Sequence, residues 1–194
     1  MASNPLIVKI HDEWGTACRH LKYDRPMPFG LKRYQQAETL HFITFSCFQR
    51  LPFLSDPHSK SVVETALEET RSRHNARIYA YVLMPNHVHL LINEPPSILL
   101  DQFLKSFKQA ASRKLKGDRK RFWQARYYDA NIGGEDARQE IIRYIHRNPV
   151  KRGLVARPHD YPWSSFRHYI TGHRGVVEIE SEWTARWRET RSSE

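Results

Sequence analysis

The sequence predicts an α+β fold built around an antiparallel sheet. Segments rich in β-branched and aromatic residues alternate with segments whose apolar residues recur at helical spacing. Two of the strand-like segments are separated only by the turn signal Met84-Pro85-Asn86, so they are expected to form a hairpin. Strands joined by so short a turn run antiparallel. The α+β class follows from this hairpin together with the single strands and helices on either side of it.

The first half of the pattern reads strand, helix, strand, strand. Residues 39–48 (TLHFITFSCF) are rich in Thr, Ile and Phe and predict the first strand. Residues 58–74 predict a helix, because apolar side chains recur there at helical spacing, namely Val62, Val63, Ala66 and Leu67. Residues 76–84 (ARIYAYVLM) and 86–94 (NHVHLLINE) are the two strands of the hairpin.

The second half reads helix, strand, helix. Residues 97–117 predict the clearest helix, which stops at Gly117 and has an apolar side formed by Leu99, Phe103, Phe107 and Ala110. Residues 121–132 (RFWQARYYDANI) read as the fourth strand. Residues 135–150 predict a last helix that ends at Asn148-Pro149 and buries Ile141, Ile142 and Ile145. The full order is that of the ferredoxin-like split βαβ arrangement with one additional C-terminal helix.

These elements are expected to form one domain, residues 33–157. Residues 1–32, rich in Pro, Gly and charge, predict an N-terminal extension, and residues 158–194 a C-terminal tail without a clear pattern. No stretch approaches the roughly 20 apolar residues of a membrane span, and the opening segment does not resemble a secretory signal. The chain is therefore expected to be soluble, and its having only two cysteines predicts a cytoplasmic protein without disulfides.

Net charge is the strongest bulk signal in the chain. A formal charge of +10 and a pI near 9.8 indicate a polyanionic partner, with nucleic acid as the leading candidate. Many of the basic residues stand beside aromatic ones between Lys105 and Arg126, a combination that suits binding of phosphates and stacking of bases. The alternative is a solvated helix face that only keeps the protein in solution. The predicted nucleic-acid-binding residues are Lys105, Lys108, Arg113, Lys114, Lys120, Arg121, Trp123 and Arg126.

Two histidines interrupt an otherwise apolar strand. His87 and His89 are two positions apart, so their side chains leave a strand on the same face, while Val88 and Leu90 point to the other. Two neighbouring imidazoles form half of a metal site. The alternative is a pair of exposed histidines on the solvent face of an amphipathic strand.

The last predicted helix carries two further polar candidates. Tyr144 and Asn148 are four positions apart and share a helix face beside the apolar stripe that must pack on the sheet. A helix laid across the sheet would bring the phenol and the amide near the histidine pair. Tyr144 could also be an ordinary half-buried aromatic residue, and Asn148 a helix stop before Pro149. His146 lies two positions from Tyr144 and faces elsewhere, so it is a poor candidate for a general base.

Several segments resemble the Y1 HUH single-strand DNA transposases. "MPNHVHLLI" and "YIHRNPVKRGLV" carry this resemblance, and "GLKRYQQAETLHFITFSC", "FWQARYYD" and "YPWSSFRHY" are similar to the REP-associated tyrosine transposases within that group. The resemblance covers the chain from about Gly30 to Tyr169. Better known members of the wider family have Gln where Asn148 stands.

The resemblance implies a ferredoxin-like nuclease that recognises a DNA hairpin and cleaves single-stranded DNA near it with Mg²⁺ or Mn²⁺. It implies Tyr144 as the catalytic nucleophile, and His87, His89 and Asn148 as metal ligands. The expected reaction forms a 5′-phosphotyrosine intermediate and then rejoins strands. A non-catalytic hairpin-binding protein and a metal-dependent hydrolase that uses water are the alternatives, and both a monomer and a homodimer remain open.

Overall fold

The structure, a computed structural model, describes residues 39–192, with side chains described as far as residue 190. All of them belong to one compact unit, Leu31–Glu194. The predicted N-terminal extension, residues 1–32, lies outside the described residues. None of the helices within the described range is long and apolar enough to cross a membrane.

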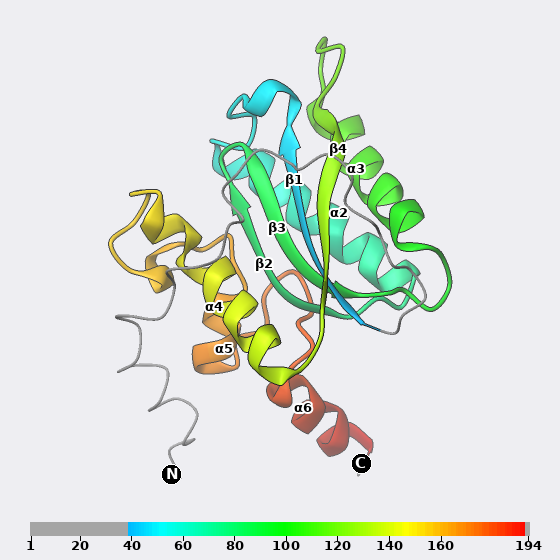
Figure 1. Ribbon diagram of the computed structural model, residues 1–194, viewed down its shortest axis with the longest axis vertical. Coiled ribbons are helices and arrows are strands. Elements are labelled where there is room, and N and C mark those ends of the chain that lie inside the picture. The colour runs from blue at the N-terminus through cyan, green and yellow to red at the C-terminus, as the bar shows by residue number, and fades with distance from the viewer. Residues whose placement is uncertain (1–38, 193–194) are drawn as a thin grey trace. The chain divides into compact units, whose positions relative to one another are not determined.

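A four-stranded antiparallel sheet forms the centre of the fold (Figure 1). Its strands are β1 (Leu40–Cys47), β2 (Ile78–Met84), β3 (His87–Asn93) and β4 (Trp123–Ile132), in the spatial order β2-β3-β1-β4. The principal helices are α2 (Pro57–Arg73), α3 (Leu100–Leu115) and α4 (Glu135–Lys151). This arrangement confirms the predicted α+β fold.

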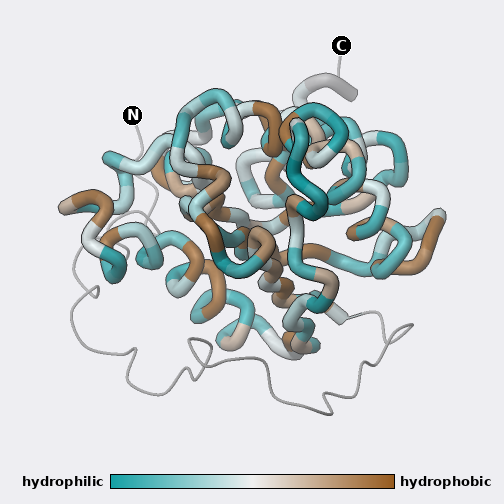
Figure 2. The backbone as a smooth tube through the Cα atoms, turned by 90° about the horizontal axis from the view of Figure 1, so that it is seen from above, coloured by the Kyte–Doolittle hydropathy of each residue, from teal (hydrophilic) through white to brown (hydrophobic). Residues whose placement is uncertain are grey.

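One face of the sheet is covered by α2 and α3 (Figure 1). The alternation of side chains directs Ile43 and Phe45 of β1, and Leu90 of β3, into this layer, where they meet Phe103 and Phe107 of α3. The helix α3 begins at Leu100, so Leu99 precedes the helix and is exposed, contrary to the prediction. Hydrophobic and hydrophilic stretches alternate along the chain (Figure 2), because each element buries one side.

The opposite face of the sheet is crossed by α4, which packs on β2 and β3 (Figure 1). The prediction that this helix ends at Asn148-Pro149 is wrong, because the helix continues through Pro149 to Lys151. A proline inside a helix removes one backbone hydrogen bond. Here the loss falls in the last turn, where the Arg152 amide still donates to the Asn148 carbonyl at 3.0 Å. The chain then leaves the helix at Gly153, whose φ of +67° suits a residue without a side chain.

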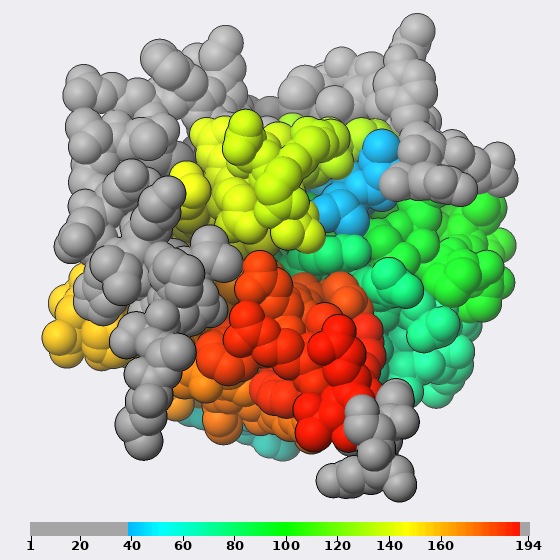
Figure 3. All heavy atoms as spheres, turned by 90° about the horizontal axis from the view of Figure 1, so that it is seen from below, coloured from blue at the N-terminus to red at the C-terminus, as the bar shows by residue number. Residues whose placement is uncertain are grey.

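The region that the sequence left as a tail packs against the outer edge of β2. It contains η2 (Pro158–Asp160), α5 (Phe166–Thr171) and α6 (Glu182–Ser192). Ser164 forms an isolated bridge with Val82, and Ile179 forms one with Ile78, so backbone groups of the edge strand are paired. Figure 3 shows this segment, orange to red, covering the lower side of the molecule. The predicted tail therefore contributes to the folded unit.

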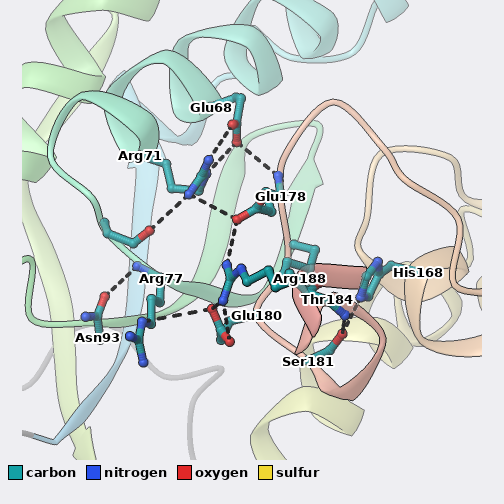
Figure 4. A network of polar contacts seen from close by, with 12 residues as sticks. Glu68, Arg71, Arg77, Asn93, His168, Glu178, Glu180, Ser181, Thr184 and Arg188 are labelled. Carbon is teal, nitrogen blue, oxygen red and sulfur yellow. Dashed lines mark hydrogen bonds and ion pairs between the residues drawn. The ribbon is translucent and has the colours of Figure 1, made fainter. Parts of the chain in front are cut away.

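A network of charged side chains lies where this C-terminal segment meets α2, and the pair Arg71–Glu178 joins the two (Figure 4). Arg71 contacts Glu68 at 2.7 Å within α2, and it also approaches Glu178 at 3.5 Å. Arg188 contacts Glu178 at 2.8 Å and Glu180 at 3.0 Å. Networks of several charges hold their members more firmly than isolated surface pairs do. The segment is thus attached by charge as well as by apolar burial.

Trp123 lies in the core at the start of β4. Its side chain is 8% exposed and packs edge-on against Phe45 and Phe122, with ring centroids 5.1 and 4.8 Å away. Its indole N–H donates to the Lys108 carbonyl at 3.0 Å. The expectation that Trp123 offers a free face to a DNA base is therefore not supported, because core rings occupy its surroundings.

Two adjacent valines test the contribution of the C-terminal segment to stability. Val177 is 2% exposed within the main core cluster, whereas Val176 is 53% exposed. Val177→Ala should lower the free energy of unfolding by about 2 kcal/mol, because it removes buried methyl groups and leaves a cavity. Val176→Ala should change it by less than about 0.5 kcal/mol. Urea unfolding followed by circular dichroism measures both, and equal effects would mean that the segment is not part of the core.

A second measurement tests the burial of Trp123. Trp123→Ala should lower the free energy of unfolding by about 3–5 kcal/mol, the usual range for a large aromatic side chain lost from a core. Lys120→Ala, an exposed change nearby, is the control and should have an effect below about 0.5 kcal/mol. If Trp123→Ala keeps full stability and weakens only the binding of single-stranded DNA, the indole is a stacking surface after all.

Candidate functional site

His87 and His89 meet on the face of the sheet that α4 crosses. Both belong to β3, and their Nε2 atoms are 3.1 Å apart, with ring planes at 81° to each other. His89 is buried and His87 is half-buried. Two imidazole nitrogens that converge in this way can bind one ion between them.

The other ring nitrogen of His87 determines which tautomer is present. Its Nδ1 lies 2.6 Å from the Oδ1 of Asn86, while the Nδ2 of Asn86 donates to the Arg50 carbonyl at 3.2 Å. Because a carbonyl accepts only, the amide nitrogen must face Arg50 and the amide oxygen must face the ring. The Nδ1–H of His87 therefore donates, and its Nε2 keeps the lone pair that a metal ligand needs.

His89 is held in the same manner from the neighbouring strand. Thr44 of β1 pairs with His89 in the sheet, and its hydroxyl lies 2.7 Å from His89 Nδ1. Burial holds the pKa of His89 well below its usual range, and the nearby His87, Arg152 and Arg50 lower this pKa further. The ring is thus neutral at physiological pH, as a metal-binding imidazole must be.

Asn148 of α4 lies beside the histidine pair. Its side chain is 2% exposed, and its Nδ2 lies 3.1 Å from His89 Nε2. Among the described residues, its Oδ1 is buried and has no hydrogen-bond partner. In this orientation the amide nitrogen faces His89, and a 180° flip of the amide would turn the oxygen, a type of ligand that suits Mg²⁺ or Mn²⁺, toward the histidine pair. No group of three His, Cys, Asp or Glu side chains in residues 39–192 could hold a metal ion.

Tyr144 lies one helical turn before Asn148 and contacts the same histidine. Its ring packs edge-on against His89, with centroids 5.4 Å apart, and against Phe42 at 5.8 Å. The Lys151 ammonium stands 5.2 Å from the centre of the phenol ring. The structure therefore brings together the four residues that the sequence singled out, Tyr144, His87, His89 and Asn148.

His146 does not share this site, and only one of the tyrosines Tyr127 and Tyr128 lies on its face of the sheet. His146 faces away from Tyr144, and its Nε2 lies 2.7 Å from the Ser165 hydroxyl. Burial, together with the nearby His168, lowers the pKa of His146 to about 3. Tyr128 contacts Phe42 on the same sheet face as His89, whereas Tyr127 lies opposite Phe45 on the face covered by α3. Tyr128 is therefore the better control residue for experiments on Tyr144.

A basic groove of about 480 Å³ lies between α3 and the start of β4. Its floor includes Lys108, whose ammonium donates to the Gln124 carbonyl at 2.8 Å. Burial lowers the pKa of Lys108 to about 8. Of the predicted nucleic-acid-binding residues, those lining the groove are Lys105, Lys108, Lys120, Arg121 and Trp123.

The remaining predicted binding residues lie elsewhere. Arg113, Lys114 and Arg126 do not line the groove, and Lys114 approaches Glu69 of α2 at 3.9 Å. Lys116 of the same basic run does line it, although it was not singled out. Sequence reasoning also missed the roles of Asn86 and Thr44. Asn86 was read only as part of a turn, and the contact of Thr44 depends on a strand register that the sequence does not show.

The chain is similar to known proteins over the region that forms this site. The family model described as "Transposase IS200 like" matches residues 35–148, more than half of the chain. The REP-associated tyrosine transposase of Escherichia coli K12 is 29% identical over 108 residues, which cover 53% of this chain and 61% of that relative. A Haemophilus influenzae protein provisionally given the same name is 27% identical over 120 residues, covering 55% and 68% of the two chains.

A solved structure shares the fold. A REP-associated tyrosine transposase bound to a REP hairpin superposes with a TM-score of 0.65 and 22% identity, covering 78% of this chain and 91% of that one. The chain spans less than two thirds of the length of the E. coli relative, so the match with that protein is partial. The family match includes both histidines, Tyr144 and Asn148. The chain therefore belongs to the family of IS200-like Y1 transposases.

Proposed function

We propose that this protein is a metal-dependent tyrosine transposase that binds a DNA hairpin, cleaves single-stranded DNA beside it and rejoins strands. The observation that carries the proposal is the convergence of two imidazole Nε2 atoms, the buried amide of Asn148 and a tyrosine at one site. Membership of the transposase family supports it. The structural neighbour bound to a REP hairpin supports a hairpin as the DNA partner.

Tyr144 is the nucleophile of the proposed reaction. Its phenolic oxygen forms a bond to the scissile phosphorus, and the bond from phosphorus to the 3′ oxygen breaks. The proton lost by the phenol balances the proton gained by the new 3′ hydroxyl. Because the phosphodiester is exchanged for a 5′-phosphotyrosine, a later 3′ hydroxyl can reverse the step and join strands without ATP.

His87, His89 and Asn148 would hold Mg²⁺ or Mn²⁺ in this proposal. When bound, such an ion neutralises charge on the scissile phosphate and orients it for in-line attack. The protein adds positive charge of its own near the site through Lys151 and Arg152. These cations favour a phosphate close to Tyr144.

The basic groove is the proposed seat of the hairpin. Lys105, Lys120 and Arg121 are exposed along it and can contact the phosphates of a duplex stem. Such contacts fix the position of the DNA and carry no sequence information themselves. Recognition of the hairpin over linear DNA must then come from the shape of the stem and from bases outside it.

Replacement of Tyr144 tests the nucleophile. Tyr144→Phe should abolish cleavage and the covalent adduct and leave hairpin affinity within about twofold of wild type, because only the reacting oxygen is removed. Tyr128→Phe is the matched control, because Tyr128 contacts the same Phe42 ring as Tyr144 does. This variant should retain both cleavage and hairpin binding. A denaturing gel of protein mixed with labelled hairpin DNA bearing single-stranded flanks reports the adduct.

The same gel separates the competing functions. Free cleaved fragments without an adduct would indicate a hydrolase that uses water, and intact DNA would indicate a binding protein. Cleavage that persists in Tyr144→Phe would assign the nucleophile to another residue.

Replacement of the histidines tests the metal site. His87→Ala and His89→Ala should each abolish cleavage and weaken Mn²⁺ binding by at least about 10–100-fold. That is the usual effect of removing a residue that only hydrogen-bonds a metal ligand, and removal of the ligand itself should cost no less. His159→Ala, an exposed change on η2, is the control. Electron paramagnetic resonance measures free Mn²⁺, and circular dichroism verifies folding. Full cleavage activity in EDTA would rule out a metal requirement.

A further inference from the structure

The turn after β1 has a backbone conformation that needs an explanation. Gln49 and Arg50 of η1 (Phe48–Arg50) have φ values of +54° and +55°, although neither is glycine. Two successive residues with side chains rarely adopt this conformation, and it persists where surrounding contacts determine it. Such strain is found at functional sites, so the contacts that hold this turn are informative.

One side of the turn is fixed to the basic groove. The Phe48 amide donates to the Phe122 carbonyl at 2.8 Å, and the Gln49 amide donates to the Gln124 side chain at 3.3 Å. Both Phe122 and Gln124 line the groove. The Arg121 guanidinium also lies over the Phe48 ring, 5.8 Å from its centre. The turn therefore borders the proposed seat of the hairpin stem.

The other side of the turn is fixed to the metal site. The Arg50 carbonyl accepts a hydrogen bond from Asn86, whose Oδ1 in turn accepts from His87 Nδ1. The backbone is joined at the same place, because the Cys47 amide donates to the Asn86 carbonyl at 2.9 Å. Two hydrogen bonds in series thus connect the carbonyl of Arg50 to a proposed metal ligand.

The side chain of Arg50, which belongs to the turn that joins these two regions, is exposed. Burial is the main cause of the lowered pKa of His89, and the positive charges of Arg50 and Arg152 contribute to it. Cations therefore occur in the groove, on the turn and near His89. A planar guanidinium can make two parallel hydrogen bonds to one phosphate, which suits a residue that must hold a strand in one position.

We propose that Arg50 binds a backbone phosphate of the single strand that leaves the hairpin stem, and that the turn carrying it aims His87 at the metal through Asn86. This inference rests on the proposed function, because it requires the stem in the groove and the scissile strand at Tyr144. Arg50 is thus a DNA-binding residue, and Asn86 is a positioning residue that acts through His87.

The first experiment compares two DNAs in EDTA, where strand cleavage does not interfere. One is a REP hairpin alone and the other is the same hairpin with single-stranded flanks at both ends of its stem. The ratio of the two Kd values measures the gain in affinity that the flanks provide. Arg50→Gln should reduce this gain about 3–10-fold and leave the affinity for the bare hairpin unchanged. Lys120→Gln combined with Arg121→Gln should weaken both DNAs alike.

Arg50→Gly is a second variant, in which the positive φ at this position causes no backbone strain. Glycine adopts positive φ readily and keeps the carbonyl that Asn86 binds, so this variant should lose the flank gain and retain wild-type Mn²⁺ affinity. An unchanged flank gain in both Arg50 variants overturns the phosphate contact, and so does a wild type without any flank gain. Failure of the wild type to bind the bare hairpin would instead contradict the proposed function.

The second experiment tests Asn86 in protein without DNA. Asn86→Ala should weaken Mn²⁺ binding by about 10–100-fold and leave the flank gain intact, the reverse of the Arg50 variants. Asn93→Ala, at the other end of β3, is the matched control and should bind Mn²⁺ as wild type does. Long-range ¹⁵N NMR of the wild type should show His87 protonated at Nδ1. Protonation at Nε2 in wild type loaded with Mg²⁺, or wild-type Mn²⁺ affinity in Asn86→Ala, would overturn the positioning role.

Discussion

The pairing of β1 with β3 is the constraint on which the candidate site depends. In this register Thr44 lies opposite His89 and Ser46 lies opposite His87, so both histidines point toward α4. A shift by one residue would turn both imidazoles into the apolar layer under α2 and α3 and expose Val88 and Leu90 in their place. The burial of those apolar neighbours therefore fixes the direction of the histidines, and the same register places the Thr44 hydroxyl at His89 Nδ1.

The positions of the site residues on α4 depend on packing as well. Tyr144 and Asn148 lie on one face of a single helix, so the packing of that helix positions both the phenol and the amide against the sheet. The two faces of the sheet thus have separate roles. The face covered by α2 and α3 buries apolar side chains, and this burial fixes the register of the strands. The face covered by α4 carries the polar groups of the candidate site, and the register determines their positions.

Much of this arrangement could be predicted from the sequence because it depends on short-range periodicity. The positions of His87 and His89 on one strand face, and of Tyr144 and Asn148 on one helix face, follow from repeats of two and 3.6 residues. Contacts whose two partners are distant in the sequence could not be predicted. Trp123 meets Phe45 across the sheet, Val177 joins the core from the C-terminal segment, and the role of Asn86 depends on the Arg50 carbonyl. The helix end was misplaced because Asn148-Pro149 is a local stop signal that packing on the sheet overrides.

The cover over the edge of β2 has a consequence for synthesis on the ribosome. The backbone of Ile78 pairs with Ile179, and that of Val82 pairs with Ser164, so both partners come much later in the chain. Until those residues leave the exit tunnel, the nascent chain presents an unpaired strand edge to its surroundings, a state prone to join with other chains. The sheet and its two histidines can form early, but the edge of β2 is covered only after Ser164 and Ile179 have been synthesised. Slow translation of the last segment should therefore prolong the period in which molecular chaperones can bind this edge.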